Sequence, residues 1–373
     1  MRAWDSLRIL HTESSTGWGG QEIRLLTEAR GMMQRGHRVT VLTPPSAELY
    51  PAAQKRGIPV VAMPIEKKRF GALLAMARWL RVHRNEYDVI NTHSSTDAWL
   101  TAAAGCCLRH APPIVRTRHV STAIGNNRAT RWLYQSATAH IVTTGEALRR
   151  QLVQVNGFDP QRITSVRTGI DLTLFKPMDK EQCRRQLGLD ARPAVGILAT
   201  LRDWKGHDYL LDAWRLLRER FADWQLLVIG DGPQRARLEA RVASEGLSSS
   251  VNFVGNQDDV PVWLNSLDLF TLPSFGDEGV PQGIMQAMAC GLAVVSTPVG
   301  AIDEAVQRDR TGLLVAPRDA VALGGALGRL MGNGAQRRAM GDAGRAYAQA
   351  NFGIDAMLDK MESVFKAAME RRT

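Results

Sequence analysis

The chain lacks the features that mark metal centres, disulfide frameworks and membrane spans. Its 373 residues include only four cysteines, none at metal-ligand spacing, so we expect reduced core residues of a cytosolic protein: Cys106, Cys107, Cys183 and Cys290. No D-x-D carboxylate pair occurs, and no histidines, cysteines and aspartates cluster at ligand spacing, so no catalytic metal is expected. The longest strongly apolar stretch, residues 98–108, is too short to span a bilayer.

Other absent features narrow the class of protein further. Trp4, Asp5 and Arg8 interrupt the first residues, so we expect no secretory signal, and no short-period repeat or low-complexity segment is visible. Aromatic residues do not interleave with the basic ones, so nucleic acid is not an expected partner. What is present, 45% hydrophobic and 23% charged residues, is typical of a globular protein, and the length suits two α/β domains.

The net charge of +10 is concentrated in the first half of the chain. Residues 1–175 hold 23 Lys and Arg against 12 Asp and Glu, whereas residues 176–373 hold 24 against 25. The densest basic part is the run KKR at residues 67–69, which continues with Arg78, Arg81 and Arg84 along the apolar segment 70–82. Two interpretations stay open: a basic amphipathic helix on anionic lipid or a phosphorylated acceptor, and a core-facing helix with a solvated polar side.

Short apolar runs alternate with helix-like patterns, which predicts parallel sheets covered by helices on both faces. The runs are residues 7–11, 39–43, 60–63, 89–93, 114–117 and 141–144, then 194–199, 225–229, 251–254, 267–272, 293–296 and 312–315. Gly36 and Gly57 suit helix C-termini, and the chain from Asp319 onward should be almost wholly helical. Two such domains joined by a hinge around residues 167–178 would place a ligand cleft at the carboxyl ends of their strands.

The most specific local pattern is LDLFTLPSFGDEGVPQGIMQAMACGLAVV at residues 267–295. Pro281 lies where a helix would begin after the loop, and Gly291 lies where it would end. Unpaired N–H groups and the dipole at such a helix start favour an anion. Glu278 stands beside this position and fits a contact to the hydroxyls of a sugar joined to phosphates; the alternative is that it only complements the helix dipole.

Two earlier loops carry comparable signals. In SSTGWGGQE at residues 14–22, Gly19 and Gly20 would let a phosphate or a sugar approach the backbone, although an ordinary tight turn is the alternative. This loop is not G-x-G-x-x-G, which disfavours a dinucleotide. In TLRDWKGH at residues 200–207, Arg202 and Lys205 would neutralise a diphosphate leaving group; the alternative is that they serve only as solvated surface charges or pair with Asp203.

Two histidines fall at predicted strand ends that face the expected cleft. A histidine in this place either hydrogen-bonds a sugar hydroxyl or carries a proton, although a structural role is the commoner case. We expect a functional role for His119, in RTRH, and leave the role of His93, in NTH, open.

Taken in order, GWGGQE with RGHRV, TGIDLTLF, RDWKG, GDGP, FVG and EGVPQGIMQAMACGLAVVSTPVG resemble the retaining glycosyltransferases of the GT-B fold, specifically glycosyltransferase family 4. The resemblance spans nearly the whole chain. It implies an α/β fold of two doubly wound Rossmann-like domains that face each other across a cleft, with a helical C-terminal end. It implies an N-terminal acceptor-side domain at residues 1–168 with 355–373 packing back onto it, a hinge at 169–178, and a nucleotide-sugar-binding domain at 179–354.

The resemblance also implies roles for individual residues. Lys205 resembles the diphosphate-binding lysine, Glu278 the carboxylate near the donor sugar, and His119 the histidine near the transferred sugar. The matching motifs imply further donor-binding residues, with the loop after FVG as the base-binding edge: Gly19, Gly20, Gly255, Asn256, Gly279, Val280, Pro281 and Gln286. The implied reaction retains the anomeric configuration, needs no metal or other cofactor, and proceeds on the front face because no protein nucleophile is evident.

The chain departs from the family pattern at two places. The Gly-Arg-Leu that commonly precedes the lysine is replaced by Ala199-Thr200-Leu201, and the arginine appears as Arg202, closer to Lys205. The family's E-x7-E pair becomes Glu278 and Gln286, and the second position is expected to bind ribose hydroxyls. A glutamine still hydrogen-bonds there, but without charge the contact should weaken.

We therefore expect a cytoplasmic retaining hexosyltransferase that is peripheral to the inner face of the cytoplasmic membrane. It would move a sugar from a UDP- or GDP-sugar to a growing surface glycan, such as lipopolysaccharide or a lipid-linked saccharide. Arg202 and Lys205 would stabilise charge on the leaving phosphate. Two alternatives stay open: a sugar-nucleotide epimerase with the same architecture, and a noncatalytic nucleotide- or glycan-binding protein.

Overall fold

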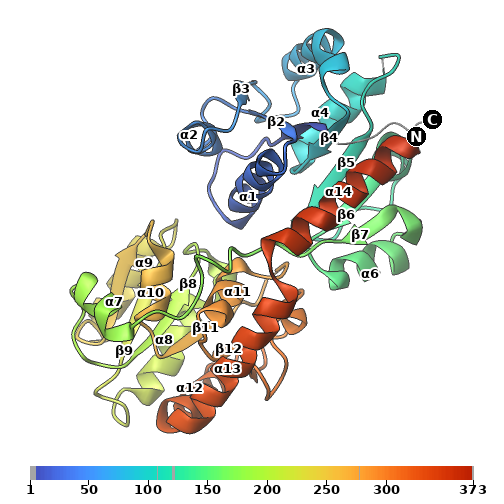
Figure 1. Cartoon of the computed structure of the whole chain (residues 1–373). Coiled ribbons are helices and arrows are strands. Elements are labelled where there is room, and N and C mark those ends of the chain that lie inside the picture. The colour runs from blue at the N-terminus through green and yellow to red at the C-terminus, as the bar shows by residue number, and fades with distance from the viewer. Residues whose placement is uncertain (1–5, 107, 120–121, 277, 372–373) are drawn as a thin grey trace. The chain divides into compact units, whose positions relative to one another are not determined.

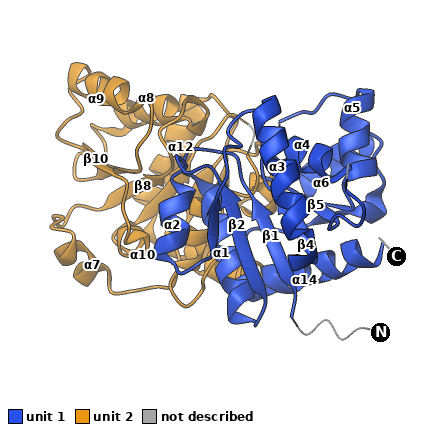
Figure 2. Cartoon of the chain, turned by 90° about the horizontal axis from the view of Figure 1, so that it is seen from above, with its two compact units in different colours: residues 1–169, 354–373 blue, residues 170–353 orange. Residues whose placement is uncertain are grey.

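The structure is a computed structural model that describes residues 6–106, 108–119, 122–276 and 278–371 (Figure 1). The chain divides into two compact units, which Figure 2 colours separately. Unit 1 comprises residues 1–169 and 354–373, and unit 2 comprises residues 170–353.

Unit 1 is built on a parallel sheet that has seven strands within the described residues, in the order β3-β2-β1-β4-β5-β6-β7. The strands are β1 (Arg8–Thr12), β2 (Arg38–Thr43), β3 (Val60–Ala62), β4 (Val89–Thr92), β5 (Ile114–Arg118), β6 (His140–Thr143) and β7 (Ile163–Ser165). The first six coincide with the apolar runs of the sequence, which confirms those predictions. The sequence did not predict β7, because its three residues, ITS, form no apolar run.

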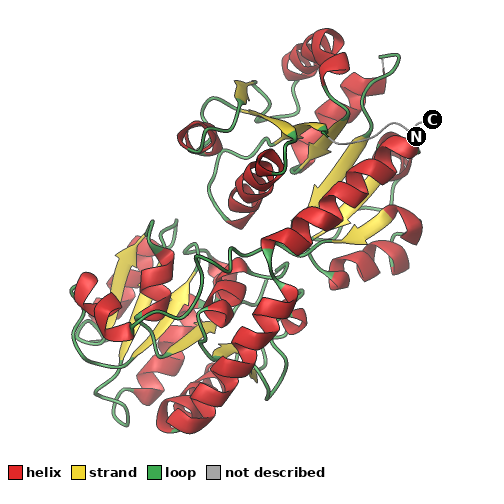
Figure 3. Ribbon diagram, in the orientation of Figure 1, coloured by secondary structure: helices red, strands yellow, loops and turns green. Residues whose placement is uncertain are grey.

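Helices cover both faces of the sheet in unit 1, as Figure 3 shows. Ile9 of β1 packs in the cluster formed with α1, α2 and α14, whereas its neighbour Leu10 packs against α3 and α4 on the other face. The helical segments are α1 (Gly20–Gln34), α2 (Leu49–Lys55), α3 (Phe70–His83), α4 (Ser95–Cys106), α5 (Arg128–Arg131), α6 (Glu146–Gln154), α14 (Ile354–Glu370) and the π-helical η2 (Trp132–Ala137). Strands buried on both faces are the reason for the continuous apolar runs in the sequence.

Unit 2 repeats this plan with a parallel sheet of six strands among its described residues, in the order β10-β9-β8-β11-β12-β13. The strands are β8 (Ala194–Leu198), β9 (Gln225–Ile229), β10 (Val251–Gly255), β11 (Leu269–Leu272), β12 (Val294–Ser296) and β13 (Gly312–Leu314). The helices are α7 (Lys180–Gln186), α8 (His207–Leu217), α9 (Arg235–Ser244), α10 (Val260–Asn265), α11 (Gln282–Ala289), α12 (Ala320–Gly332) and α13 (Gly334–Asn351). Helix α8 packs against α12, and α11 packs against α13.

Several local predictions are confirmed and one is wrong. Gly36 and Gly57 follow helices with left-handed φ values of +89° and +67°, and helices fill most of the described chain after Asp319. Of the four cysteines expected in the core, Cys183 and Cys290 are buried, and Cys107 lies outside the described residues. Cys106 is exposed, because it is the last residue of α4, where the helix leaves the sheet.

Both strand orders reverse at one point, between β1 and β4 in unit 1 and between β8 and β11 in unit 2. In doubly wound sheets, ligands bind at the carboxyl ends of the strands beside this reversal. The loops that follow β1, β4, β8 and β11 are therefore the places where functional residues are expected. Among the described helices, none has both the length and the apolar character needed to cross a membrane.

Candidate active site

In unit 2, Lys205 and Glu278 meet at the reversal of the sheet. Lys205 ends η4 (Asp203–Lys205) after β8, and Glu278 lies in the loop after β11. The Nζ atom of Lys205 is 2.6 Å from Oε1 of Glu278, and the hydroxyl of Ser274 donates to the same oxygen at 2.7 Å. Glu278 is only 7% exposed. Residues 73 positions apart thus form a partly buried ion pair where the fold predicts a ligand site.

Two glycines allow the backbone to approach this ion pair closely. Gly206 has a φ of +78°, and a Cβ there would lie 2.0 Å from the carbonyl oxygen of Pro273. Gly300 has a φ of +62°, and a Cβ there would lie 2.0 Å from the carbonyl oxygen of Glu278. Any larger residue would push these segments apart, so the glycines fix the distance between Lys205 and Glu278.

Arg202, the second predicted cation, has a different environment. Its side chain is exposed, and its guanidinium lies 5.2 Å from the centre of the Trp204 ring. No ion pair with Asp203 is present in the part of the chain that the structure describes. Arg202 therefore lies on the same turn as Lys205 with its charge directed toward solvent, and its role toward phosphate stays a prediction.

The other predicted donor-binding residues of unit 2 occupy two loops. Gly279, Val280 and Pro281 lead into α11, with Pro281 at the N-cap and Val280 buried, and Gln286 is half-buried on that helix. Gly255 ends β10 with a φ of +73°, and Asn256 after it is exposed. Their roles in donor binding remain predictions.

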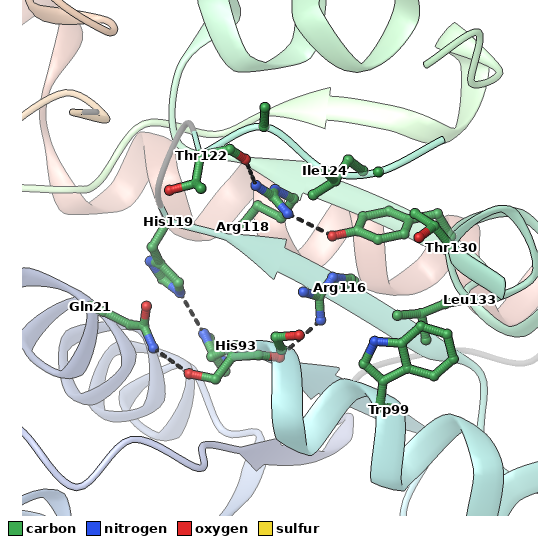
Figure 4. A pocket seen from close by; sticks show the side chains of 15 residues that line it. Gln21, His93, Trp99, Arg116, Arg118, His119, Thr122, Ile124, Thr130 and Leu133 are labelled. Carbon is green, nitrogen blue, oxygen red and sulfur yellow. Dashed lines mark hydrogen bonds between the residues drawn. The ribbon is translucent and has the colours of Figure 1, made fainter. Parts of the chain in front are cut away.

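In unit 1, three histidines form a hydrogen-bonded row. Nδ1 of His11 lies 2.9 Å from Nε2 of His93, and Nδ1 of His93 lies 2.9 Å from Nε2 of His119. His11 and His93 are buried on β1 and after β4, whereas His119, after β5, is half-buried. Figure 4 shows His93 and His119 side by side at the edge of a pocket. The predicted residue His119 is thus held in place by His93.

All three imidazoles are held in the neutral form. Burial lowers the pKa of His11 to about 3 and lowers the pKa of His93 and of His119 well below the ordinary value. The positive charges of Arg24 and Arg116 act in the same direction on His93 and His119. The row therefore consists of hydrogen-bonding groups rather than charged ones near neutral pH.

The pocket beside this row has a volume of about 360 Å³ and is lined by two arginines of β5. Arg116 donates from Nη1 to the carbonyl of Ser94 at 2.9 Å, and its guanidinium lies 5.0 Å from the centre of the Tyr134 ring. Arg118 donates to the Tyr134 hydroxyl and to the carbonyl of Thr122, each at 2.7 Å (Figure 4). The guanidinium groups of Arg116 and Arg118, at alternate positions of β5, therefore make one wall of this pocket positively charged.

The glycine loop of unit 1 contains an unexpected carboxylate. Gly19 is the N-cap of α1 and Gly20 is its first residue. The side chain of Glu22 is buried in the first turn, with one oxygen 3.6 Å from where a Cβ of Gly19 would lie. This carboxylate already complements the helix dipole, so the role of Gly19 and Gly20 toward phosphate stays a prediction.

Two buried acids lie behind the glycine loop. Glu13 accepts hydrogen bonds from the Ser15 amide, the Ser94 hydroxyl and the Gln21 side chain. Asp97 accepts from the hydroxyl of Thr12 and from the amides of His93 and Ser94. Burial and repulsion from Asp97 raise the pKa of Glu13 to about 8, and burial raises that of Asp97 to about 6. These acids fix the loops that carry the histidine row.

The sequence did not single out His11, Glu13, Asp97, Arg116, Arg118 and Tyr134. A usable signal existed for the arginines, because IVRTR places charges at alternate positions of a strand that is otherwise buried. In the described ranges, no three His, Cys, Asp or Glu side chains are grouped to hold a metal ion. The expectation of a metal-independent reaction stays a prediction.

Two doubly wound parallel-sheet units in one chain are the architecture of the GT-B class of fold. The family model for Glycosyltransferase Family 4 matches residues 18–174, and that for Glycosyl transferases group 1 matches residues 192–333. The chain belongs to glycosyltransferase family 4, which confirms the resemblance and the fold class expected from the sequence.

The curated relatives include bacterial glycosyltransferases. The lipopolysaccharide core biosynthesis mannosyltransferase LpsB of Rhizobium meliloti is 33% identical over 68% of this chain and 74% of its own length. The D-inositol 3-phosphate glycosyltransferase of Salinispora tropica is 28% identical over 98% of this chain and 84% of its own length. Both relatives are named as glycosyltransferases, one for lipopolysaccharide core biosynthesis and the other for D-inositol 3-phosphate.

Solved structures share the fold. Anabaena Alr3699/HepE, solved in complex with UDP and glucose, has a TM-score of 0.85 at 22% identity and covers 96% of this chain and 99% of its own. A glycosyltransferase from Rickettsia africae has a TM-score of 0.86 at 20% identity, covering 98% and 99%. At this identity the likeness concerns the fold alone.

Proposed function

We propose that this glycosyltransferase moves a hexosyl group from a UDP- or GDP-sugar, bound by unit 2, to a glycan or glycolipid acceptor, bound by unit 1. The relatives named for lipopolysaccharide core synthesis and for D-inositol 3-phosphate support a bacterial surface or small-polyol glycoside as product. The neighbour solved with UDP and glucose supports a nucleotide-sugar donor. We propose retention of the anomeric configuration and no metal requirement.

The observation that carries this proposal is the Lys205–Glu278 pair at the reversal of the unit 2 sheet. Glu278, whose carboxylate also accepts from the Ser274 hydroxyl, holds the ammonium of Lys205 in one place, so little side-chain ordering is needed when a diphosphate binds. Arg202 lies three residues earlier and adds a second cation from the same turn. Charge that develops on the leaving diphosphate is stabilised by these two cations, which is the largest contribution expected in such a transfer.

Unit 1 offers polar groups that suit a hydroxylated acceptor. A hollow of about 580 Å³ is lined largely by hydroxyl side chains, and it shares Ser94 and Ser95 with the arginine-lined pocket: Ser14, Ser15, Thr16, Ser94, Ser95 and Thr96. His119 adds a neutral imidazole at the edge of the arginine-lined pocket. Neutral hydrogen-bonding groups match the hydroxyls of a saccharide without a charge penalty.

Helix α3 supports association of unit 1 with an anionic membrane surface. Its inner side, Ala72, Met76 and Leu80, packs in the core, as the alternative interpretation required. Its outer side nevertheless exposes apolar and basic side chains together, namely Phe70, Leu74, Arg78, Arg81 and Val82, and the exposed Lys67, Lys68 and Arg69 directly precede the helix. Apolar groups beside cations are the pattern of a helix that lies on an anionic interface.

A panel of UDP- and GDP-sugars, followed by thermal unfolding, tests the donor. The matching donor should raise the melting temperature, because a ligand at 100 times its dissociation constant stabilises by about 2.7 kcal/mol. NMR of the product from that donor then reports the anomeric configuration, and chelator-treated enzyme reports the metal requirement. Conversion of the donor sugar without an acceptor, or binding without turnover over a broad acceptor panel, would contradict transfer.

A further inference from the structure

The pocket of about 360 Å³ in unit 1 concentrates positive charge in a buried place. Arg116 is 4% exposed and Arg118 is 8% exposed, and both line the pocket. A third cation, Lys68, does not line the pocket but contacts two residues that do, and so lies at its rim: its Nζ is 5.5 Å from the centre of the Trp99 ring and 3.3 Å from the Ser95 hydroxyl. Burial and the charge of Arg116 lower the pKa of Lys68.

The charge of Arg116 is not matched by an ion pair among the described residues. Its Nη1 donates to a neutral carbonyl, and its buried Nε has no hydrogen-bond partner there. The charge of Arg116 lowers the pKa of Asp97, although burial has the larger effect and raises it. The oxygens of Asp97, however, accept hydrogen bonds from Thr12 and from the amides of His93 and Ser94. A buried guanidinium without a carboxylate partner is costly unless a ligand completes it.

Tyr134 fixes the two guanidinium groups against one aromatic face. Arg116 and Arg118 lie 5.0 Å and 5.9 Å from its ring centre, and its hydroxyl accepts from Arg118. Burial raises the pKa of Tyr134, yet the two arginines bring it below the ordinary value. The positive groups are therefore ordered before any ligand arrives, and Figure 4 shows both pointing into the pocket from β5.

We propose that this pocket binds a phosphate group carried by the acceptor, with Arg116 and Arg118 as its ligands and Lys68 at the rim. Planar guanidinium groups bind phosphate oxygens through paired hydrogen bonds, and several cations favour a dianion over a single carboxylate. The inference rests on the proposed transfer, because it names the chemistry of the acceptor that unit 1 takes.

The size of the pocket limits the group that enters. A volume of about 360 Å³ lies at the lower end of the roughly 300–1,000 Å³ found for ligand pockets. It suits one phosphorylated ring and not a long glycan. His119 and Thr130 line the same pocket and offer hydrogen bonds to hydroxyls beside the phosphate.

Calorimetric titration of the full chain at low ionic strength tests the inference. The probes are inorganic phosphate, D-inositol 3-phosphate and unphosphorylated inositol, with phosphatidylglycerol vesicles as a lipid source of phosphate. Arg116→Gln removes one guanidinium, Tyr134→Phe removes the hydroxyl that orders Arg118, and Arg30→Gln makes the same charge change on the exposed side of α1. UDP and GDP binding to every variant checks that unit 2 is intact.

We expect wild-type protein to bind D-inositol 3-phosphate and not inositol. Arg116→Gln should weaken binding of the phosphorylated probe about 10- to 100-fold, since a hydrogen bond to a charged group contributes roughly 1.5–3 kcal/mol. Tyr134→Phe should weaken it by a smaller factor, and Arg30→Gln should not change it. If Arg116→Gln weakens binding to phosphatidylglycerol vesicles and to no other probe, the site still binds phosphate, and a lipid headgroup supplies it.

Equal affinity of wild type and Arg116→Gln for every phosphate probe would overturn the inference. If nucleotide binding persists in that case, the proposed transfer stands and only the phosphate site is wrong. If wild-type protein binds the phosphate probe but no nucleotide sugar, the phosphate site stands and the proposed transfer fails.

Discussion

Nδ1 of His93 lies 2.9 Å from Nε2 of His119, and this contact determines which nitrogen of His119 carries its proton. A neutral imidazole has one N–H, and the buried Nε2 of His11 has no hydrogen-bond partner among the described residues. Because an unpaired buried N–H is costly, His11 carries its proton on Nδ1 and donates to His93. His93 then donates from Nδ1 to His119, so His119 must carry its own proton on Nδ1.

The first prediction follows from that order of protons. In wild-type protein, ¹⁵N NMR should show His119 as the Nδ1–H tautomer, and all three histidines should be neutral near pH 7, because burial lowers each pKa. His11→Phe removes the first donor of the row, so a second tautomer of His119 should appear. His140→Phe, a buried histidine outside the row, is the control. An Nε2–H tautomer of His119 in wild type would refute the order.

The second prediction concerns pH and Glu13. An unfolded glutamate ionises near pH 4.5, whereas Glu13 in the folded state keeps its proton until its pKa of about 8. Between these values the folded state binds the extra proton, so the free energy of unfolding should fall as pH rises, by at most about 1.4 kcal/mol per pH unit. Glu13→Gln should flatten this dependence in urea denaturation from pH 5 to 9. The exposed Glu48→Gln is the control, and identical slopes for Glu13→Gln and wild type would contradict the assignment.

Much of the fold was predictable because strands buried on both faces leave continuous apolar runs. Strand β7 and the π-helical η2 were not, since a short strand of ITS leaves no run and a π-helix depends on tertiary packing. Lys205, Glu278 and His119 were singled out by motif, and their roles stay predictions. The histidine row was not found, because His11 and His93 are 82 residues apart and only the β1–β4 pairing brings them together.

The third prediction separates backbone strain from the geometry of the site. Gly300 and Gly246 have nearly the same φ, +62° and +65°, but a Cβ at Gly300 would lie 2.0 Å from the Glu278 carbonyl oxygen and one at Gly246 meets nothing within 4 Å. Gly246→Ala should cost about 1–2 kcal/mol of stability and leave turnover unchanged. Gly300→Ala should cost more and also lower turnover by displacing Glu278. Chemical denaturation and initial rates measure both; equal turnover in the two variants would show that the close approach is not needed.

The fourth prediction concerns the departure at Gln286. This residue is half-buried on α11, within the segment that begins at Pro281. If it contacts the ribose, Gln286→Glu adds a charged acceptor and should tighten nucleotide binding by about three- to tenfold, because charge-assisted hydrogen bonds are stronger. Calorimetric titration with the nucleotide of the donor measures the change, and Gln54→Glu on the exposed side of α2 controls for net charge. Unchanged or weaker affinity would place Gln286 away from the ribose.

The fifth prediction separates the catalytic role of Lys205 from its structural role. Lys205→Ala should lower kcat by roughly two to three orders of magnitude, because it removes a cation from the leaving diphosphate. It also deprives buried Glu278 of its ammonium partner 2.6 Å away, which should destabilise unit 2 by up to about 3–5 kcal/mol. The double variant Lys205→Met with Glu278→Gln removes both charges, so stability should recover while turnover should not.

The exposed Arg215→Ala on α8 controls for loss of a positive charge in the same unit and should behave as wild type. Urea denaturation and initial rates under saturating donor give the two quantities for each variant. If turnover recovers together with stability in the double variant, then Lys205 only supports the fold. If stability recovers and turnover stays low, the ammonium acts on the substrate itself, because the remaining loss is then independent of how well unit 2 folds.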